Sequence, residues 1–304
     1  MTGPTGAGKS AFAAALAKRI SGEVIGADAF QIYKGLPILT AQPSLELTQS
    51  VPHHLVGFLD LRESFDAARY AMAARQKIED IQSRGKYPIL TGGTGLYLKS
   101  LTHGLAELQP IDPVLRADIN AMAPETAFLK LDSLDPRARH QIDIKNPVRI
   151  RRALEIVIST GQPLENSRTQ WKNNADLKQE FCGIVLTRDR EDLRHRIASN
   201  VDSMFASGVI EEVRQALAIL DQLPTDPKAL LCRRAIGFRE IEALLTGQST
   251  EETCRAAIVL ASQRYAKRQL TWCRTQFNFS TINLSSNPFP EPALTLAMPF
   301  LKEE

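Results

Sequence analysis

Eight residues near the start of the chain have the types and spacing of a phosphate-binding loop. The segment Gly3-Pro4-Thr5-Gly6-Ala7-Gly8-Lys9-Ser10 fits the pattern G-x-x-x-x-G-K-[ST]. Its glycines let backbone N–H groups converge on phosphate oxygens, Lys9 adds positive charge, and the Ser10 hydroxyl can bind Mg²⁺. A plain glycine turn before an Ala-rich helix is the alternative, but turning alone does not explain Lys-Ser at this spacing. The pattern predicts a phosphorylated ligand without identifying it.

Two further polar residues follow expected strands. Asp28 comes directly after the apolar run Val24–Ala27, and Thr94 lies in the glycine turn after the strand expected at Tyr87–Thr91. Ligands of open parallel sheets bind at the carboxyl ends of the strands, where both residues would lie. A carboxylate at this edge can act as a general base. Taken singly, a capping aspartate and a turn hydroxyl explain them equally well.

Basic residues are concentrated near the C-terminus. No acidic residue occurs from Thr253 to Ser280. The basic residues of this segment are Arg255, Arg264, Lys267, Arg268 and Arg274. Solvated helix faces usually mix both signs of charge, so this segment predicts a basic stripe that binds a phosphate backbone.

The elements that must position these residues alternate as strand, glycine turn and helix, which predicts a parallel α/β core formed by residues 1–108 and 179–280. Expected helices cover Ala11–Ile20 and Phe65 to about Arg84, the second capped by Ser64. A phosphate loop normally follows an apolar strand, but only Met1-Thr2 precede this one. We expect five to ten added apolar residues, on the order of one strand, to raise stability and activity.

The alternation of strand, glycine turn and helix stops between residues 109 and 178. Asp112-Pro113, Asp135-Pro136 and Asn146-Pro147 each place a capping residue before a proline at the first helical position. They predict an all-helical insertion, followed by a polar return linker at Gln170–Glu180. Cys182–Leu186 should then rejoin the sheet as a strand.

The rest of the chain is expected to be helical. Gly208 and Pro224 should separate the helices, and Ser249 with Glu252 fits a capping box for a long one. The proline-rich segment 281–304 should be an irregular tail.

Bulk properties exclude several classes of protein. The 304 residues carry a formal net charge of only +3, so nucleic-acid binding must depend on where the basic residues lie. No apolar run reaches the length of a membrane span and no signal segment opens the chain. The four cysteines form no CxxC pair, which favours a reducing cytoplasm over a disulfide or zinc framework.

At Asp28–Gly35 and Thr40–Pro43 the sequence resembles the tRNA dimethylallyltransferases of the bacterial type. The resemblance extends over nearly the whole chain. Its segments are Pro52-His53-His54-Leu55, Gly92-Gly93-Thr94-Gly95-Leu96-Tyr97, Arg152-Ala153-Leu154-Glu155 with Thr160-Gly161, Ala235-Ile236-Gly237-Phe238-Arg239-Glu240, and Tyr265-Ala266-Lys267-Arg268-Gln269 with Thr271-Trp272.

This resemblance implies a P-loop NTPase-like core with the helical insertion. It also implies transfer of a dimethylallyl group from dimethylallyl diphosphate to N6 of the adenosine 3′ of the anticodon, adenosine 37. Asp28 matches the family's base, Thr94 the threonine near the reacting centre, and the loop with Lys9 and Mg²⁺ would stabilise the leaving pyrophosphate.

The resemblance further implies contact with the anticodon stem-loop of tRNA by a protein that we expect to be monomeric. The matching residues are Asp28, Ala29, Phe30, Gln31, Thr94, Arg116, Val148, Arg149, Ile150, Arg151, Arg152, Arg264, Lys267 and Arg268. The target base must leave the anticodon stack to reach such a site.

One departure bears on catalysis. Asn200 stands where relatives usually carry an arginine expected near the pyrophosphate, and Arg196 or Arg194 are candidates to replace it. Two other functions stay open: a small-metabolite kinase that uses the loop for ATP, and a tRNA-binding relative that has lost catalysis. The pair His53-His54 suggests a metal, but adjacent histidines point apart, and we favour a structural or substrate-lining role.

Overall fold

The computed structural model describes residues 1–104, 111–166, 181–222 and 230–301. The chain divides into two compact units, one formed by Met1–Leu101 with Glu180–Glu304 and the other by Thr102–Gln179. The segment expected as an insertion lies inside the second unit. The expected linker at Gln170–Glu180 and the break at Pro224 lie outside the described residues.

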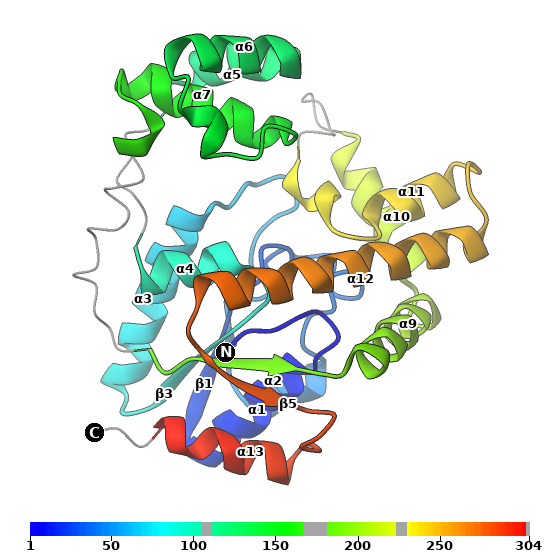
Figure 1. Ribbon diagram of the computed structural model, residues 1–304. Helices are drawn as coiled ribbons and strands as arrows, with labels where there is room; N and C mark the ends of the chain where they lie inside the picture. Colours follow the sequence, from blue (N-terminus) through cyan, green and yellow to red (C-terminus); the bar gives the residue numbers. More distant parts are fainter. Residues whose placement is uncertain (105–110, 167–180, 223–229, 302–304) are drawn as a thin grey trace. The chain divides into compact units, whose positions relative to one another are not determined.

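The first unit is built from parallel strands and helices (Figure 1). Its described strands are β1 (Gly22–Gly26), β2 (His53–His54), β3 (Tyr87–Thr91), β4 (Ile184–Thr187) and β5 (Ser280–Asn283). Its described helices are α1 (Lys9–Ile20), α2 (Leu45–Ser50), α3 (Ala67–Ser83), α4 (Gly95–Thr102), α9 (Arg190–Ala206), α10 (Val209–Leu220), η3 (Leu231–Arg234), α11 (Phe238–Leu245), α12 (Glu251–Gln276), α13 (Glu291–Ala297) and η4 (Met298–Leu301).

All strand pairs among the described residues are parallel. β1 pairs with β2 on one side and with β3 on the other, and β4 pairs with β5. Thr2 joins the two sheets, because it forms parallel bridges with Gly92 beyond β3 and with Val185 in β4. The first residues of the chain therefore lie between β3 and β4, and the predicted parallel α/β core is confirmed.

Successive side chains of the central strands point to opposite faces of the sheet, and helices pack against both faces. Val24 and its register partner Ile89 pack in a core with Phe12 and Leu16 of α1. Ile25 belongs to a second core that contains the buried residues of α3, including Tyr70. With both faces covered, the carboxyl edge of the sheet is where ligands of such folds bind.

Two predicted helix caps are wrong by one or two residues. The side chain of Asp66, not Ser64, accepts from the backbone N–H of Arg69 and caps α3. Thr250, not Ser249, accepts from the N–H of Thr253 and caps α12. In each case the capping oxygen is the one placed three residues before its donor.

The expectation of an irregular C-terminal segment is also wrong. β5 pairs with β4 in register from Ser280 to Asn283, and α13 buries Ala293, Leu294 and Ala297. These side chains join the core that contains α1. The prolines of this segment suggested irregular structure. The strand and the helix are both short and depend on tertiary contacts, which the sequence does not show.

The second unit is helical over its described residues. Its elements are α5 (Pro113–Ala121), α6 (Pro124–Leu134), η1 (Ala138–His140) and α7 (Pro147–Thr160). Asp112 and Asn146 cap α5 and α7 as predicted, and Gly161 ends α7. Asp135-Pro136 does not begin an α-helix: it precedes only the short η1, because Asp135 ends α6 and its side chain accepts from Leu164 N–H. Ile119, Leu131 and Leu154 lie in a core of this unit's own.

Candidate active site

The predicted phosphate loop leads directly into α1. Gly8 precedes the first helical residue with φ 99°, a left-handed conformation that favours glycine. The loop therefore presents the N-terminus of α1, where unpaired N–H groups and the helix dipole favour an anion. The Nζ of Lys9 donates to the Pro4 carbonyl oxygen at 2.8 Å. Burial lowers the pKa of Lys9 to about 8.

Side chains from distant parts of the chain hold this loop. Arg188, after β4, donates from Nε to the Ala7 carbonyl at 3.0 Å, and Arg196 of α9 donates to the Gly6 carbonyl at 3.1 Å. The backbone N–H of Thr5 donates to Oε1 of Gln269 in α12 at 2.8 Å. These hydrogen bonds fix the loop in place, which reduces the entropy lost when a ligand binds.

Asp28 lies just beyond β1 and is half-buried. Its Oδ1 accepts from the N–H groups of Phe30 at 3.0 Å and of Gln31 at 3.4 Å. The hydroxyl of Thr94 accepts from the Ala29 N–H at 2.9 Å. Thr94 therefore braces the turn that carries Asp28, as the sequence pattern had placed both at one edge of the sheet.

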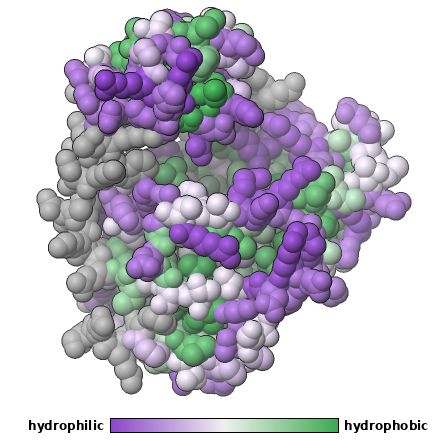
Figure 2. Space-filling view, in the orientation of Figure 1, coloured by the Kyte–Doolittle hydropathy of each residue, from purple (hydrophilic) through white to green (hydrophobic). Residues whose placement is uncertain are grey.

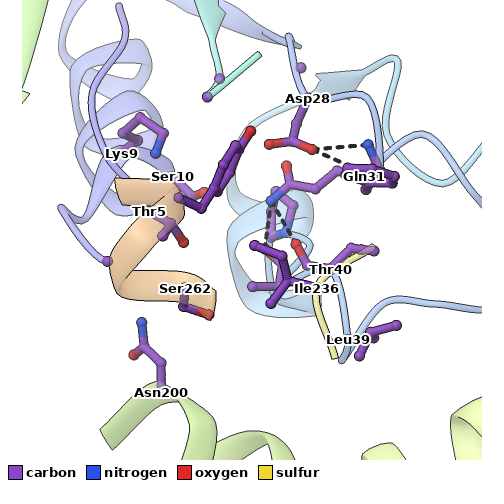
Figure 3. Close-up of a pocket in the computed structure, with 18 of the residues that line it drawn as sticks. Thr5, Lys9, Ser10, Asp28, Gln31, Leu39, Thr40, Asn200, Ile236 and Ser262 are labelled. Carbon is purple, nitrogen blue, oxygen red and sulfur yellow. Dashed lines mark hydrogen bonds between the residues drawn. The ribbon is translucent and has the colours of Figure 1, made fainter. Parts of the chain in front are cut away.

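One cavity of about 460 Å³ joins the phosphate loop to Asp28 (Figure 3). Predicted residues that line it are Thr5, Gly6, Gly8, Lys9, Ser10, Asp28, Phe30, Gln31 and Arg268. Apolar side chains complete the wall, among them Leu39, Val201, Met204, Ile236 and Ile258. The cavity therefore combines a phosphate-binding end, a carboxylate and an apolar surface in one volume.

Some predicted residues frame this cavity instead of lining it. Gly3, Pro4 and Ala7 are buried within the loop, and Ala29 contributes its N–H to Thr94. Thr94 does not line the cavity either. Their contribution is to hold the loop and the Asp28 turn.

The sequence did not single out Gln269 and Tyr265 as site residues. Gln269 is buried and bridges two parts of the site, since it accepts from Thr5 and donates to the Gly93 carbonyl at 3.0 Å. Tyr265 lines the cavity one helical turn earlier, and burial together with the charge of Asp28 raises its pKa. Their spacing of four residues within a basic helix was the available signal, because it places both on one helix face.

Glu212 of α10 was also missed. Its two carboxylate oxygens accept from the N–H groups of Ile38 at 2.8 Å and Leu39 at 2.7 Å. Desolvation raises the pKa of Glu212. Because Leu39 lines the cavity, this distant carboxylate positions part of its apolar wall.

Oxygen donors that suit a hard cation lie around the phosphate end. Ser10 lines the cavity, and so does Thr91, whose buried hydroxyl has no hydrogen-bond partner in the part of the chain that the structure describes. No group of three or more His, Cys, Asp or Glu that could hold a metal occurs among the described residues. Mg²⁺ is usually held by one or two protein groups together with phosphates and water, so the donors present fit it.

The two adjacent histidines do point apart. His54 Nε2 lies 2.7 Å from Glu23 Oε2, and Glu23 also binds Arg84 and Lys86. His53 lines the cavity, its Nδ1 bonds to the Val51 carbonyl at 2.8 Å, and its buried Nε2 finds no hydrogen-bond partner among the described residues. Burial lowers the pKa of His53, and a neutral ring that donates from Nδ1 offers Nε2 as an acceptor. His54 is thus held in an ion-pair network, whereas His53 lines the cavity.

Six of the residues predicted to contact tRNA lie in the second unit. Arg116 and Arg152 both pair with the buried Glu155, at 3.4 and 2.8 Å. Arg151 donates to the Met122 carbonyl at 2.8 Å, and Val148 and Arg149 are exposed. Ile150 needs a correction, because it is 3% exposed in the core of this unit and its side chain is not available to RNA.

The basic residues of α12 do not form a single stripe. Arg255 is paired with Glu251 at 2.6 Å and Asp202 at 3.1 Å, so it is not a free cation. Arg268 lines the cavity, whereas Arg264 and Lys267 line a separate groove. The basic residues of α12 are therefore divided among an ion-pair cluster, the cavity and the separate groove.

Arg196 and Arg194, the two candidates to replace an arginine at position 200, lie in different cavities. Asn200 and Arg196 both line the cavity, and Arg196 touches the phosphate loop through Gly6. Arg194 lies in the other groove. Of these two arginines, Arg196 is the one that lies where it can contact a group bound by the loop.

Comparison with known proteins gives the family. Residues 31–276 match the family model described as IPP transferase. The chain belongs to the IPP transferase family. The match spans most of the chain and includes Asp28's neighbours Gln31 to Gly35, the Gly92–Tyr97 turn and α12.

Curated relatives are similar over nearly their full length. The tRNA dimethylallyltransferase of Akkermansia muciniphila is 37% identical, over 91% of this chain and 90% of that protein. The tRNA dimethylallyltransferase of Geobacter sulfurreducens is 41% identical, over 90% of this chain and 87% of that protein.

Solved structures share the fold of this IPP transferase. The tRNA isopentenylpyrophosphate transferase of Bacillus halodurans has a TM-score of 0.71 at 33% identity, covering 99% of this chain and 93% of that chain. A eukaryotic dimethylallyltransferase acting on tRNA has a TM-score of 0.82 at 26% identity, covering 98% and 76%. In the described part of the chain, no helix is both long enough and apolar enough to cross a membrane.

Proposed function

We propose that this IPP transferase transfers the dimethylallyl group of dimethylallyl diphosphate to N6 of adenosine 37, 3′ of the anticodon, in tRNA. The products are N6-dimethylallyladenosine and pyrophosphate. The observation that carries this proposal is the single cavity in which a phosphate loop and the Asp28 carboxylate face an apolar wall. The names of the curated relatives point to the same reaction.

The phosphate end suits the diphosphate. The N-terminus of α1, Lys9 and Arg196 supply positive charge where the leaving group would lie. Ser10 would hold Mg²⁺ against the diphosphate oxygens, and the Thr91 hydroxyl in the same cavity is a second oxygen donor. Bound there, Mg²⁺ would supply charge to the departing pyrophosphate.

Asp28 suits the role of base. The adenine amine is a poor nucleophile, because its lone pair is delocalised into the ring. As the bond from N6 to C1 of the dimethylallyl group forms and the bond from C1 to the diphosphate oxygen breaks, N6 must lose a proton. Asp28 would take it, since its Oδ2 makes none of the hydrogen bonds that hold the turn.

The apolar wall suits the hydrocarbon. Leu39, Ile236 and Ile258 line the cavity beside its polar end and would contact the five-carbon group. Excluding water there strengthens the electrostatic interactions at the reacting atoms. The tRNA would enter as an anticodon stem-loop with adenosine 37 turned out of its stack. We propose that the protein acts as a monomer in the cytoplasm.

The deciding experiment combines the purified protein with unmodified tRNA, Mg²⁺ and labelled dimethylallyl diphosphate. We expect label in adenosine 37 and release of one pyrophosphate per transfer. Label that stays in the donor while ATP is consumed with a small acceptor would instead indicate a kinase. Tight tRNA binding without transfer would indicate a relative that has lost catalysis.

A further inference from the structure

A second groove lies outside the candidate active site and is lined by residues of α9, α12, β4 and β5 in the first unit. Figure 1 shows how these elements are arranged. The volume of the groove is about 790 Å³. Leu193, Ile197 and Ala266 form a small apolar cluster, and Ile197 lines both cavities. This cluster separates the groove from the active site, so the groove is not part of the reaction chamber.

The groove is strongly basic. Its lining includes six basic residues and one acid, in a chain whose formal net charge is only +3. The basic residues are Arg188, Arg190, Arg194, Arg264, Lys267 and Arg274. Figure 2 shows hydrophilic residues bordering apolar ones on this face of the molecule.

Nearby acids are already committed to other partners. Asp189 accepts from Nδ2 of Asn283 at 2.9 Å. Asp192 pairs with Arg188 at 2.8 Å and accepts from Ser285. Asp189 keeps its negative charge because Asn283 is neutral, but the five other cations of the groove still outnumber this one lining carboxylate.

Those five side chains are exposed and, among the described residues, make no ion pair or hydrogen bond. They are Arg190, Arg194, Arg264, Lys267 and Arg274. Exposed cations that outnumber the carboxylates near them repel one another, and a bound polyanion would relieve that repulsion. The arrangement therefore indicates a missing anionic partner.

The shape favours an extended partner over a single phosphate. Arg264 and Arg274 are ten residues apart on α12, which is about 15 Å along the helix. Arg190 and Arg194 form a second row one turn long on α9. One phosphate group cannot contact both rows over that length, whereas a nucleic-acid strand repeats its charges along it.

We propose that this groove binds the phosphate backbone of the tRNA substrate, outside the nucleotide that enters the active site. The proposal rests on the proposed function for the identity of the RNA. It assigns to Arg190 and Arg194 of α9 a role that the sequence did not suggest, beside Arg274, which the sequence already placed in a predicted phosphate-binding segment. Phe277 and Phe279 line the same groove and offer apolar ring surfaces beside the charges.

The groove contributes affinity and position, not chemistry, because the apolar cluster separates it from the reacting groups. Phosphate contacts set the register of a nucleic acid without reading its sequence. Binding through them releases counterions, so affinity should fall steeply with salt.

The test uses the full-length Arg190→Gln/Arg194→Gln variant and a matched Lys18→Gln/Lys77→Gln variant, which loses two cations from α1 and α3. Equilibrium binding of unmodified tRNA is measured over a range of salt concentrations. We expect the α9 variant to bind about fivefold or more weakly and its log–log salt slope to fall by about two. The control should keep the wild-type slope, and both should melt like the wild type.

Two readouts separate this role from others. At saturating tRNA, kcat and the KM for dimethylallyl diphosphate should stay at wild-type values. Unchanged tRNA affinity and salt slope in the α9 variant would overturn the proposal. So would loss of inorganic pyrophosphate binding with tRNA binding intact, because the groove would then hold a small anion.

A failure of the proposed function can be distinguished from a failure of the groove proposal. Prenyl transfer is assayed apart from tRNA binding. A wild-type protein that binds tRNA but transfers nothing would contradict the proposed function, while the binding comparison would still decide the role of the groove.

Discussion

At the residue scale, the site separates positioning from chemistry. One oxygen of Asp28 holds the turn through Phe30 and Gln31, which leaves the other free for a substrate proton. Thr94 braces the same turn through Ala29. A substitution at Asp28 can therefore fail for two different reasons, and the variant has to distinguish them.

Asp28→Asn keeps an oxygen that accepts from the turn but removes the base. We expect transfer to fall by roughly 10²- to 10⁴-fold, the usual contribution of general-base catalysis. The affinity for tRNA, measured by filter binding, should stay nearly wild-type. Asp28→Ala should lose activity at least as completely and also loosen the turn. Near-wild-type turnover in Asp28→Asn would remove Asp28 as the base.

Lys9 gives the site a pH dependence. Burial lowers its pKa to about 8, and a bound diphosphate would favour the charged form. Affinity for pyrophosphate should therefore fall as pH rises above about 8, by up to about tenfold for each pH unit, because Lys9 must then take up a proton to bind. Calorimetry in two buffers of different ionisation heat should detect this proton uptake at pH 9.

The control for Lys9 is Lys9→Arg, which stays charged throughout. Its affinity should change only with the titration of pyrophosphate itself. Without ligand, the unfolded chain holds the Lys9 proton more tightly than the fold does. This group therefore makes the wild type more stable as pH rises from about 8 toward 10.5. A wild type that matches Lys9→Arg at every pH would contradict the assignment.

Asn200 lines the cavity at a position where the family resemblance implies an arginine. We expect Asn200→Arg to lower the KM for dimethylallyl diphosphate by about tenfold, as one added charge-assisted contact would do. Steady-state kinetics at saturating tRNA measure it. Asn200→Gln has similar reach without charge and should leave KM unchanged. Equal values for all three proteins would show that Arg196 already meets the need.

At the scale of elements, α12 connects the parts of the site. Its buried Gln269 accepts from Thr5 in the phosphate loop and donates to Gly93 after β3. Tyr265 and Arg268 on the same helix line the cavity, and Arg264 and Lys267 line the outer groove. One helix thus joins the substrate cavity to the proposed RNA surface.

Gln269→Leu should disrupt that connection. It leaves the Thr5 N–H and the buried Gly93 carbonyl without partners, at a cost of about 1–3 kcal/mol for each unsatisfied group. We expect Tm to fall by several degrees and pyrophosphate affinity to weaken, because the loop loses its anchor. Thermal melts with and without pyrophosphate measure both effects.

Gln269→Glu separates the two bonds, because it keeps an acceptor for Thr5 but repels the Gly93 carbonyl. Its Tm should fall while the loop stays anchored, so pyrophosphate affinity should lie between those of the wild type and Gln269→Leu. Wild-type stability in Gln269→Leu would mean that the bridge does not hold the loop.

At the scale of the whole molecule, the two units have separate hydrophobic cores in the described residues. The first unit has cores on both faces of its sheet, and the second has one around Ile119, Leu131 and Leu154. A chain whose units each bury their own core can lose one without the other.

Leu154→Ala tests this independence. Leu154 is fully buried, and its truncation should cost about 2–5 kcal/mol in the second unit. Hydrogen exchange should accelerate in residues 111–166, while pyrophosphate binding by the first unit stays unchanged. Leu129→Ala, at a position 68% exposed in α6, is the matched control and should resemble the wild type. Uniformly faster exchange over the whole chain would contradict separate cores.

Local features decided what could be predicted from the sequence alone. The glycine loop that leads into α1, the strand at Tyr87–Thr91 and the caps Asp112 and Asn146 depend on residues within a few positions of one another, and their local structure was predicted correctly. The parallel α/β class followed from their alternation. These features are determined locally because backbone hydrogen bonds and caps join near neighbours.

Tertiary structure decided what depends on distant contacts. β5 and α13 were missed because they form only against β4 and α1, about 95 or more residues away in sequence. The roles of Gln269, Glu212 and Arg196 depend on backbone groups that the sequence does not place near them. The division of the α12 cations between a cavity, an ion pair and a groove depends on which helix face meets which neighbour. The residues that can do chemistry were thus visible in the sequence, while packing alone determined which of them share a site.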